Sequence, residues 1–180
     1  MMSASSGGLK IRRFGAHELT DVFEHDLMEI ETRCFEPDIQ ETWESKRKLI
    51  ERSDIILFAY DENKIIGEAY TAKEAAGDMG EPGHRDTVHL EEVFAKAKKE
   101  NGVYFMSFAI LPEYQGKGIG KQLMADMFSV CKKEGFKVVY SHAHEGASAH
   151  MFESFGGEFI EEREDWFDTG VSYYLYRIQL

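Results

Sequence analysis

Two periodicities of apolar and polar residues run through the chain, and together they predict alternating strands and helices. Residues 54–60 and 65–70 are short, mostly apolar runs separated by the polar residues 61–64, a pattern typical of a β-hairpin. Residues 104–110 are apolar or aromatic except for Ser107, which favours a strand buried on both faces. Longer segments place apolar residues three or four positions apart, which indicates helices.

The predicted elements can be set out in chain order. The predicted strands are residues 9–14, 54–60, 65–70, 104–110, 137–143, 158–165 and 171–179. The predicted helices are residues 17–34, 39–52, 89–99, a segment that starts among the glycines 116–120 and ends near 133, and 147–155. A helix joins strand 104–110 to strand 137–143, so these two strands should be parallel. We therefore expect one α/β domain over residues 9–180, with a mixed sheet and helices on both faces.

Composition narrows the class of protein. The chain has 180 residues, enough for one domain with a substantial core, and no apolar run approaches the ~18 residues of a membrane span. Residues 1–8 lack the apolar stretch of a signal peptide and are expected to be a disordered tail. Two cysteines suggest no disulfide framework, which favours a cytoplasmic location.

The net charge is the strongest compositional signal about partners. A formal charge of −12 argues against nucleic acid as a general partner, because phosphate binding needs a basic surface. The same charge favours cationic partners such as amines or basic peptides, although an acidic surface also simply keeps proteins in solution.

Three glycines at alternate positions stand between the strand 104–110 and the following helix. Gly116, Gly118 and Gly120 remove Cβ atoms, so a ligand can approach the backbone closely. The first turn of a helix also carries unpaired N–H groups and favours negative charge. With Lys117 and Lys121 beside them, these residues predict a site for phosphate or diphosphate.

Two familiar phosphate motifs do not fit this segment. A P-loop would need glycine where Gln115 stands and serine or threonine where Gln122 stands. In the dinucleotide fingerprint the third glycine would come one residue later, and an acidic residue would end the next strand, which instead ends in Tyr140-Ser141-His142.

The segment Gln115-Gly116-Lys117-Gly118-Ile119-Gly120 closely resembles the Gln/Arg-x-x-Gly-x-Gly/Ala signature of the GNAT superfamily of acyl-CoA-dependent N-acetyltransferases. The resemblance implies a mostly antiparallel sheet in which the parallel strands 104–110 and 137–143 splay apart around acetyl-CoA. It implies transfer of an acetyl group to a primary amine of a small molecule or a peptide. The cofactor-binding residues that it implies are Phe108, Ala109, Ile110, Gln115, Gly116, Lys117, Gly118, Ile119, Gly120 and Lys121.

The catalytic groups are less evident, because the sequence departs from the family pattern. The tyrosine that protonates the leaving thiolate in the family maps on Phe152, and two positions that carry the base in different branches map on Tyr104 and Tyr140. A different acid, water or direct release of the thiolate is then implied, and Tyr173 or Tyr174 is a substitute acid. A backbone N–H at a strand bulge near 109–110 is expected to bind the oxyanion.

Three residues remain as candidates for the base, namely Glu68, His142 and His144, and we favour His142 and Glu68. A His-x-His pair can also bind a metal, but no tight ligand spacing supports this, so no metal is expected. The departure at Phe152 leaves open a non-catalytic acyl-CoA-binding module, and a nucleotide-binding protein is a third, weaker reading.

Residues 71–102 separate two strands that the family usually joins by a short turn, so they form an insertion relative to that pattern. One interpretation is that the insertion covers or shapes the acceptor site. The other is a surface embellishment or a contact between two copies, which would make a homodimer. The sequence does not identify the acceptor amine.

Overall fold

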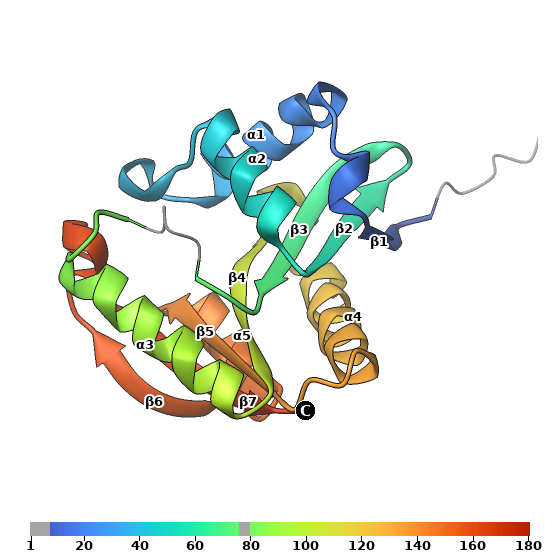
Figure 1. Ribbon diagram of the computed structural model, residues 1–180. Helices are drawn as coiled ribbons and strands as arrows, with labels where there is room; N and C mark the ends of the chain where they lie inside the picture. The colour runs from blue at the N-terminus through green and yellow to red at the C-terminus, as the bar shows by residue number, and fades with distance from the viewer. Residues whose placement is uncertain (1–7, 76–79) are drawn as a thin grey trace, which may run out of the picture.

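The computed structural model describes residues 8–75 and 80–180, and it contains a seven-stranded sheet flanked by helices (Figure 1). The predicted tail 1–8 lies outside the described residues except for Gly8, as do residues 76–79 of the predicted insertion. The strands are β1 (Lys10–Phe14), β2 (Ile55–Asp61), β3 (Lys64–Ala72), β4 (Gly102–Ile110), β5 (Val138–His144), β6 (Glu158–Arg163) and β7 (Tyr173–Gln179). The α-helices are α1 (Glu24–Cys34), α2 (Trp43–Arg52), α3 (Arg85–Lys99), α4 (Ile119–Lys133) and α5 (Ala147–Ser154).

The strands lie in the order β1-β2-β3-β4-β5-β7-β6, and every neighbouring pair is antiparallel except β4 and β5. That parallel pair is short, because the ladder joins only residues 102–104 to residues 138–140. Beyond this point the two strands have no further register and separate. The predicted mixed, mostly antiparallel sheet with one splayed parallel pair is therefore confirmed.

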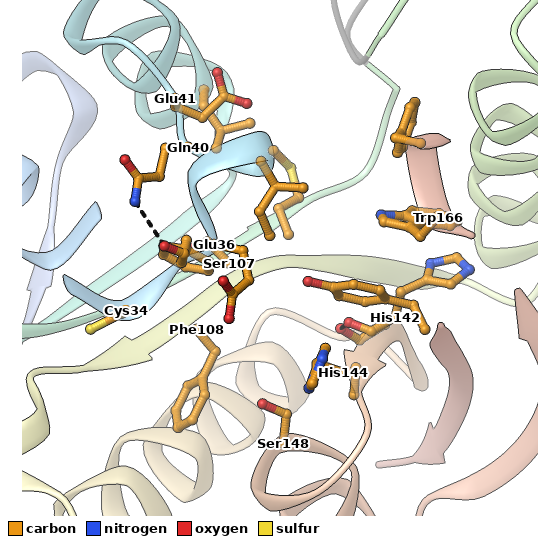
Figure 2. Close-up of a pocket in the computed structure, with 18 of the residues that line it drawn as sticks. Cys34, Glu36, Gln40, Glu41, Ser107, Phe108, His142, His144, Ser148 and Trp166 are labelled. Carbon is orange, nitrogen blue, oxygen red and sulfur yellow. Dashed lines mark hydrogen bonds between the residues drawn. The ribbon is translucent and has the colours of Figure 1, made fainter. Parts of the chain in front are cut away.

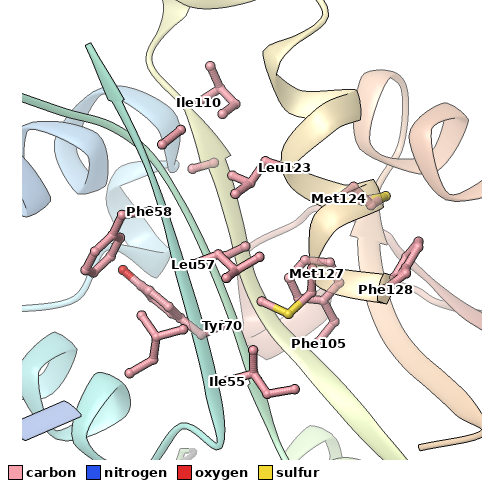
Figure 3. Packing of buried hydrophobic residues seen from close by; sticks show 14 of the residues in the cluster. Ile55, Leu57, Phe58, Tyr70, Phe105, Ile110, Leu123, Met124, Met127 and Phe128 are labelled. Atoms are coloured by element: carbon pink, nitrogen blue, oxygen red, sulfur yellow. The ribbon is translucent and has the colours of Figure 1, made fainter. Parts of the chain in front are cut away.

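Helices cover both faces of the sheet, as predicted. Helices α1, α2 and α3 lie on one face and α4 and α5 on the other (Figure 1). Successive side chains of β4 show the division, since the ring of Tyr104 packs on Phe94 of α3 and the ring of Phe105 packs on Phe128 of α4. Figure 3 shows Phe105 within the apolar layer between the sheet and α4, close to Met127.

A bulge interrupts the pairing of β3 with β4. Tyr70 pairs with Ser107 while Thr71 pairs with Phe105, which leaves Met106 as the extra residue. The bulge thus lies closer to the point where β4 leaves β5 than predicted, and the expected position near 109–110 was wrong. An extra residue locally bends the strand, which suits the divergence of β4 from β5.

Helix boundaries differ from the predictions where capping or an extended backbone intervenes. The predicted helix 17–34 is divided, because the backbone is extended at Leu19 and Thr20, and two 3-10 turns (16–18 and 21–23) precede α1. Helix α2 begins at residue 43 because the Thr42 hydroxyl caps it by accepting the Ser45 N–H at 3.2 Å. Helix α3 begins four residues before the predicted start, with the His84 ring accepting the Asp86 N–H. None of the described helices has the length and apolarity needed to cross a membrane.

Candidate functional site

A cavity of about 600 Å³ opens where β4 and β5 diverge (Figure 2). Its floor is formed by β4 and β5 residues, including Ser107, Phe108 and His142. One wall is the segment from the end of α1 to α2, and the other is formed by residues near the β6–β7 connection and by Gly80 and Leu90 of the predicted insertion. The cavity therefore collects side chains from widely separated parts of the chain.

The glycine loop, residues 115–121, has a backbone that favours glycine at two of its positions. Gly116 and Gly118 have φ of +71° and +81°, and a Cβ built on either would meet no atom within 4 Å. Gly118 is the N-cap of α4, and no side chain caps the helix there. The first-turn amides of α4 are thus left available at an open, exposed surface, which fits a diphosphate group.

The glycine loop is fixed to the end of β4 and touches the cavity through one aromatic ring. The Gln115 side chain donates to the Ile110 carbonyl at 2.9 Å. A Cβ on Gly120 would lie 3.3 Å from Cζ of Phe108, a residue that also lines the cavity. The absence of a side chain at Gly120 therefore lets α4 approach the strand, and it joins the loop to the cavity at Phe108.

A cluster of charged residues is buried behind the wall of the cavity. The Lys46 ammonium donates to Glu31 Oε2 at 2.6 Å and to Glu68 Oε1 at 2.7 Å, and all three residues are buried. Tyr70 and Ser107 donate to the Glu68 carboxylate, Ser107 at 2.9 Å. The predicted base Glu68 does not line the cavity itself, but Ser107 does, so the hydroxyl of Ser107 links the carboxylate to the cavity.

Burial and pairing act against each other in this cluster. Burial alone lowers the pKa of Lys46, but the carboxylates of Glu68 and Glu31 outweigh it and hold the pKa of Lys46 above its usual value. Burial raises the pKa of Glu31, and Lys46 offsets only part of that rise. Lys46 is the only lysine or arginine among the described cavity-lining residues. Its ammonium group is paired with the carboxylates of Glu31 and Glu68.

A chain of three aromatic polar groups crosses from the cavity to α3. The Tyr104 hydroxyl lies 2.7 Å from Nδ1 of His142, and Nε2 of His142 lies 3.0 Å from Nε2 of His89. Tyr104 and His142 line the cavity, whereas His89 lies behind them on α3. Both ring nitrogens of the predicted base His142 are therefore occupied by protein partners.

The surroundings of Tyr104, His142 and His89 keep the two imidazole rings neutral. Burial, then His89 and Arg163, lowers the pKa of His142 to about 3. Burial followed by Arg163 also lowers the pKa of His89, against the opposing effect of Glu161. Burial raises the pKa of the Tyr104 hydroxyl well above its usual value.

Trp166 and His142 lie next to each other in the lining of the cavity, as Figure 2 shows. The two rings are stacked with centroids 4.3 Å apart. The turn that carries Trp166 is strained, because the neighbouring non-glycine residues Asp165, Phe167 and Asp168 all have positive φ. Asp86, buried at the start of α3, accepts the Phe167 N–H and an Arg163 N–H, both at 2.9 Å, and so binds α3 to this turn.

The structure separates the remaining candidates. His144 lines the cavity and is exposed, with its Nδ1 2.7 Å from the Glu145 carbonyl oxygen. Of the two substitute acids, Tyr173 lines the cavity and Tyr174 does not. Phe152 also lines it, stacked on Tyr176. Among the described residues, no three or more His, Cys, Asp or Glu side chains are grouped as metal ligands would be.

Sequence reasoning missed Lys46, His89 and Trp166. Lys46 lies three residues after Trp43 and four before Ile50, on the apolar side of α2, so its position gave a readable signal of burial. His89 and Trp166 carry no such signal, because only the packing of α3 against the β6–β7 connection brings them to His142.

The profile of the Acetyltransferase (GNAT) family matches residues 24–156, which is most of the chain. The chain belongs to the GNAT acetyltransferase family. No curated protein matches its sequence. Family membership supports transfer of an acetyl group from acetyl-CoA, and the open glycine loop fits the coenzyme's diphosphate.

Solved structures with the same fold are distant in sequence. The ribosomal-protein-S18-alanine N-acetyltransferase from Escherichia coli has a TM-score of 0.66 and 14% identity, with 96% of this chain and 94% of that chain covered. An agmatine N-acetyltransferase mutant has a TM-score of 0.70 and 14% identity over 96% and 100%. A GNAT family acetyltransferase from Elizabethkingia anophelis, with acetyl-CoA bound, has a TM-score of 0.61 and 14% identity over 96% and 98%. At these identities the likeness shows the fold alone.

Proposed function

We propose that this GNAT protein is an N-acetyltransferase that moves the acetyl group of acetyl-CoA to a primary amine held in the cavity between β4 and β5. The observation that carries the proposal is the position of Phe108, which lines the cavity and packs against Gly120 of the glycine loop. The loop and the cavity therefore adjoin at Phe108, so a coenzyme bound by its diphosphate at the loop would have its acyl arm next to the cavity.

The coenzyme would be held by backbone more than by side chains. Amides of residues 116–121 face the diphosphate at the start of α4, and Lys117 and Lys121 add positive charge. The end of β4, residues 108–110, lies beside the acyl arm. The edge of β4 that faces β5 has no strand partner beyond Tyr104 in the described structure, so backbone N–H groups there suit the oxyanion.

The acceptor is proposed to be a cationic amine of a small molecule or a peptide. Glu36, Asp38 and Glu41 are exposed acidic residues that line one wall of the cavity. The lining also contains aromatic rings, among them Phe35 and Trp166. Because Glu31 is paired with Lys46, it is a structural support for this wall rather than a free contact for the amine. Gly80 and Leu90 in the lining support the idea that the predicted insertion shapes the acceptor site.

We propose that His142 and Glu68 take part in proton transfer and that neither removes a proton from the amine directly. His142 lines the cavity, but its Nδ1 is occupied by the Tyr104 hydroxyl at 2.7 Å, so its protons pass through that hydroxyl. Glu68 does not line the cavity and is linked to it through the hydroxyl of Ser107. Holding the thioester and the amine together in the cavity supplies much of the rate acceleration. Proton transfer through His142 or Glu68 therefore has to supply only the remainder.

The test is release of CoA thiol from acetyl-CoA across a panel of amines, with mass spectrometry of the acetylated product. Diamines, aromatic amines and peptides with free N-termini or lysines should be compared, and cationic acceptors are expected to react fastest.

A second candidate, a non-catalytic acyl-CoA-binding module, is favoured by Phe152, which has no proton to give a thiolate. It predicts stabilisation by acetyl-CoA without amine-dependent thiol release.

A further inference from the structure

We propose that His89, supplied by α3, completes a proton relay with His142 and Tyr104 that carries the proton of the acceptor amine out of the cavity and later returns it to the leaving sulfur. This inference rests on the proposed acetyl transfer and deepens it. It assigns a function to the helix between β3 and β4, which family resemblance leaves without one.

The relay is continuous and its order is fixed by the fold. Tyr104 Oη and His142 Nδ1 are 2.7 Å apart, and His142 Nε2 and His89 Nε2 are 3.0 Å apart, so each step is within hydrogen-bond reach. Only the first two groups line the cavity. A proton that enters at the Tyr104 hydroxyl therefore leaves through His142 to His89, behind the cavity wall.

The hydrogen bonds themselves constrain the resting tautomers. If the Tyr104 hydroxyl donates to Nδ1 of His142, then Nε2 of the same neutral ring must carry the hydrogen and donate to His89. His89 then accepts at Nε2 and carries its own hydrogen on Nδ1. Each member is poised to accept on its cavity side and to donate on its far side, which is the arrangement that a relay needs.

The proton can be followed through the reaction. The acceptor reacts as the neutral amine, after its ammonium form has lost one proton to solvent. The amine nitrogen bonds to the thioester carbon, and its N–H proton passes to Tyr104 Oη while that oxygen gives its own proton to His142 Nδ1. His142 Nε2 passes its hydrogen to His89 Nε2. When the C–S bond breaks, the sulfur takes the bonding pair, and reversal of the same transfers delivers one proton to the thiolate. The products are the amide and CoA thiol, and the relay returns to its starting state.

Neutral, weakly basic imidazoles suit this task. A nitrogen that is becoming an amide nitrogen gives up its proton readily, so a weak base suffices once the C–N bond is forming. The charge that arrives on His89 is offset by Glu161 of β6, whose Oε1 lies 3.8 Å from His89 Nε2 and whose side chain is partly exposed. Asp86 and Glu92 of α3 act in the same direction, and Arg163 of β6 opposes them.

Packing holds the relay in place from all sides. The His142 ring stacks on Trp166, and the Tyr104 ring packs on Phe94 of α3. The ring of His89 meets that of His142 edge-on, with centroids 5.1 Å apart. His89 makes no contact with the cavity, so it is a positioning and relay residue rather than one that touches substrate.

The experiment compares His89→Gln with wild type. Glutamine retains a hydrogen-bonding group near Nε2 but cannot accept a proton, so a purely structural role would be rescued and a relay role would not. We expect kcat to fall by about 10- to 100-fold with the KM for acetyl-CoA unchanged. The matched control is His25→Gln, which removes an exposed histidine at the start of α1 and should leave kcat unchanged.

A measurement that needs no turnover accompanies it. Imidazole ¹⁵N chemical shifts should show both His89 and His142 neutral at pH 7, and Tyr104→Phe should alter the shifts of both rings. An unchanged His89 signal in that variant would overturn the relay.

If wild type transfers acetyl groups and the kcat of His89→Gln is within twofold of the wild-type kcat, the relay is wrong and the proposed function stands. If wild type transfers to no amine while acetyl-CoA binds, the proposed function itself fails and the relay with it.

Discussion

The ammonium of Lys46 on α2 lies 2.7 Å from a carboxylate oxygen of Glu68 on β3, and both side chains are buried. Glu31 of α1 completes the cluster at 2.6 Å. One lysine of α2 is therefore paired with both helix α1 and strand β3. Because the same Glu68 oxygen accepts the Ser107 hydroxyl, the cluster also fixes one polar group of the cavity floor.

Replacing Lys46 should be severely destabilising. Lys46→Met leaves two buried carboxylates without their cation, and we expect a loss of about 3–5 kcal/mol in the free energy of unfolding, measured by urea denaturation. Adding Glu68→Gln should recover part of the loss, because one uncompensated charge is removed. Lys48→Met, which removes an exposed partner of Glu44 on the same helix, is the control and should change stability by less than about 1 kcal/mol. Equal effects at residues 46 and 48 would contradict the buried pairing.

Binding of the coenzyme should be sensitive to Gly118 in a way that backbone strain alone does not explain. Gly118→Ala places a Cβ at a positive φ on the surface where the diphosphate is proposed to bind, and we expect the calorimetric Kd for acetyl-CoA to rise at least about tenfold. Gly135→Ala is a close control, since residue 135 has φ of +91° and equally open surroundings but lies beyond the far end of α4. Similar losses of affinity in both variants would point to general destabilisation.

The attachment of α3 to the β6–β7 connection should depend on the charge of Asp86. Asp86→Asn preserves the shape of the side chain but weakens its bonds to Arg163 and the Phe167 amide, and a loss of about 1.5–3 kcal/mol is expected. In a Trp43→Phe background, the fluorescence of Trp166 should shift to longer wavelength as the turn loosens. Asp168→Asn alters an exposed ion pair in the same turn and should have little effect. Unaltered emission in Asp86→Asn would show that the turn does not need this bond.

The lowered pKa of His142 has a consequence for stability at acid pH. In the unfolded chain the ring titrates near 6.5, whereas burial, His89 and Arg163 lower the folded pKa to about 3. Below pH 6.5 the unfolded state therefore binds a proton that the folded state does not, and stability falls as the pH falls. Between pH 6.5 and 4.5 this amounts to about 2–3 kcal/mol. Urea denaturation of wild type and His142→Asn should show a shallower acid loss in the variant; parallel curves would contradict the depressed pKa.

Most of the fold could be predicted from patterns within short stretches of the sequence. The hairpin 54–70, the parallel connection through α4 and the glycine loop all depend on residues close together in sequence, and the structure has each of them. The cap at Thr42 placed the start of α2 at residue 43 rather than at the predicted residue 39, because capping geometry decides boundaries that periodicity leaves open. The position of the β4 bulge depends on the register with β3, which a single strand does not reveal.

The site was less accessible to sequence reasoning, since it is assembled from distant segments. The glycine loop could be recognised because one short motif contains its backbone chemistry. His142 was identified as a candidate, but its partners Tyr104, His89 and Trp166 come from three other elements. That both nitrogens of His142 are occupied follows only from tertiary packing, and it changes the role that can be proposed for it.

The central claim is that acetyl-CoA lies with its diphosphate on the glycine loop and its thioester in the cavity between β4 and β5. A crystal structure of the protein with acetyl-CoA tests this most directly. We expect diphosphate oxygens at hydrogen-bond distance from amides of residues 116–121, and the thioester beside Phe108 within the cavity. A coenzyme bound elsewhere, with the glycine loop in contact only with solvent, would contradict the account.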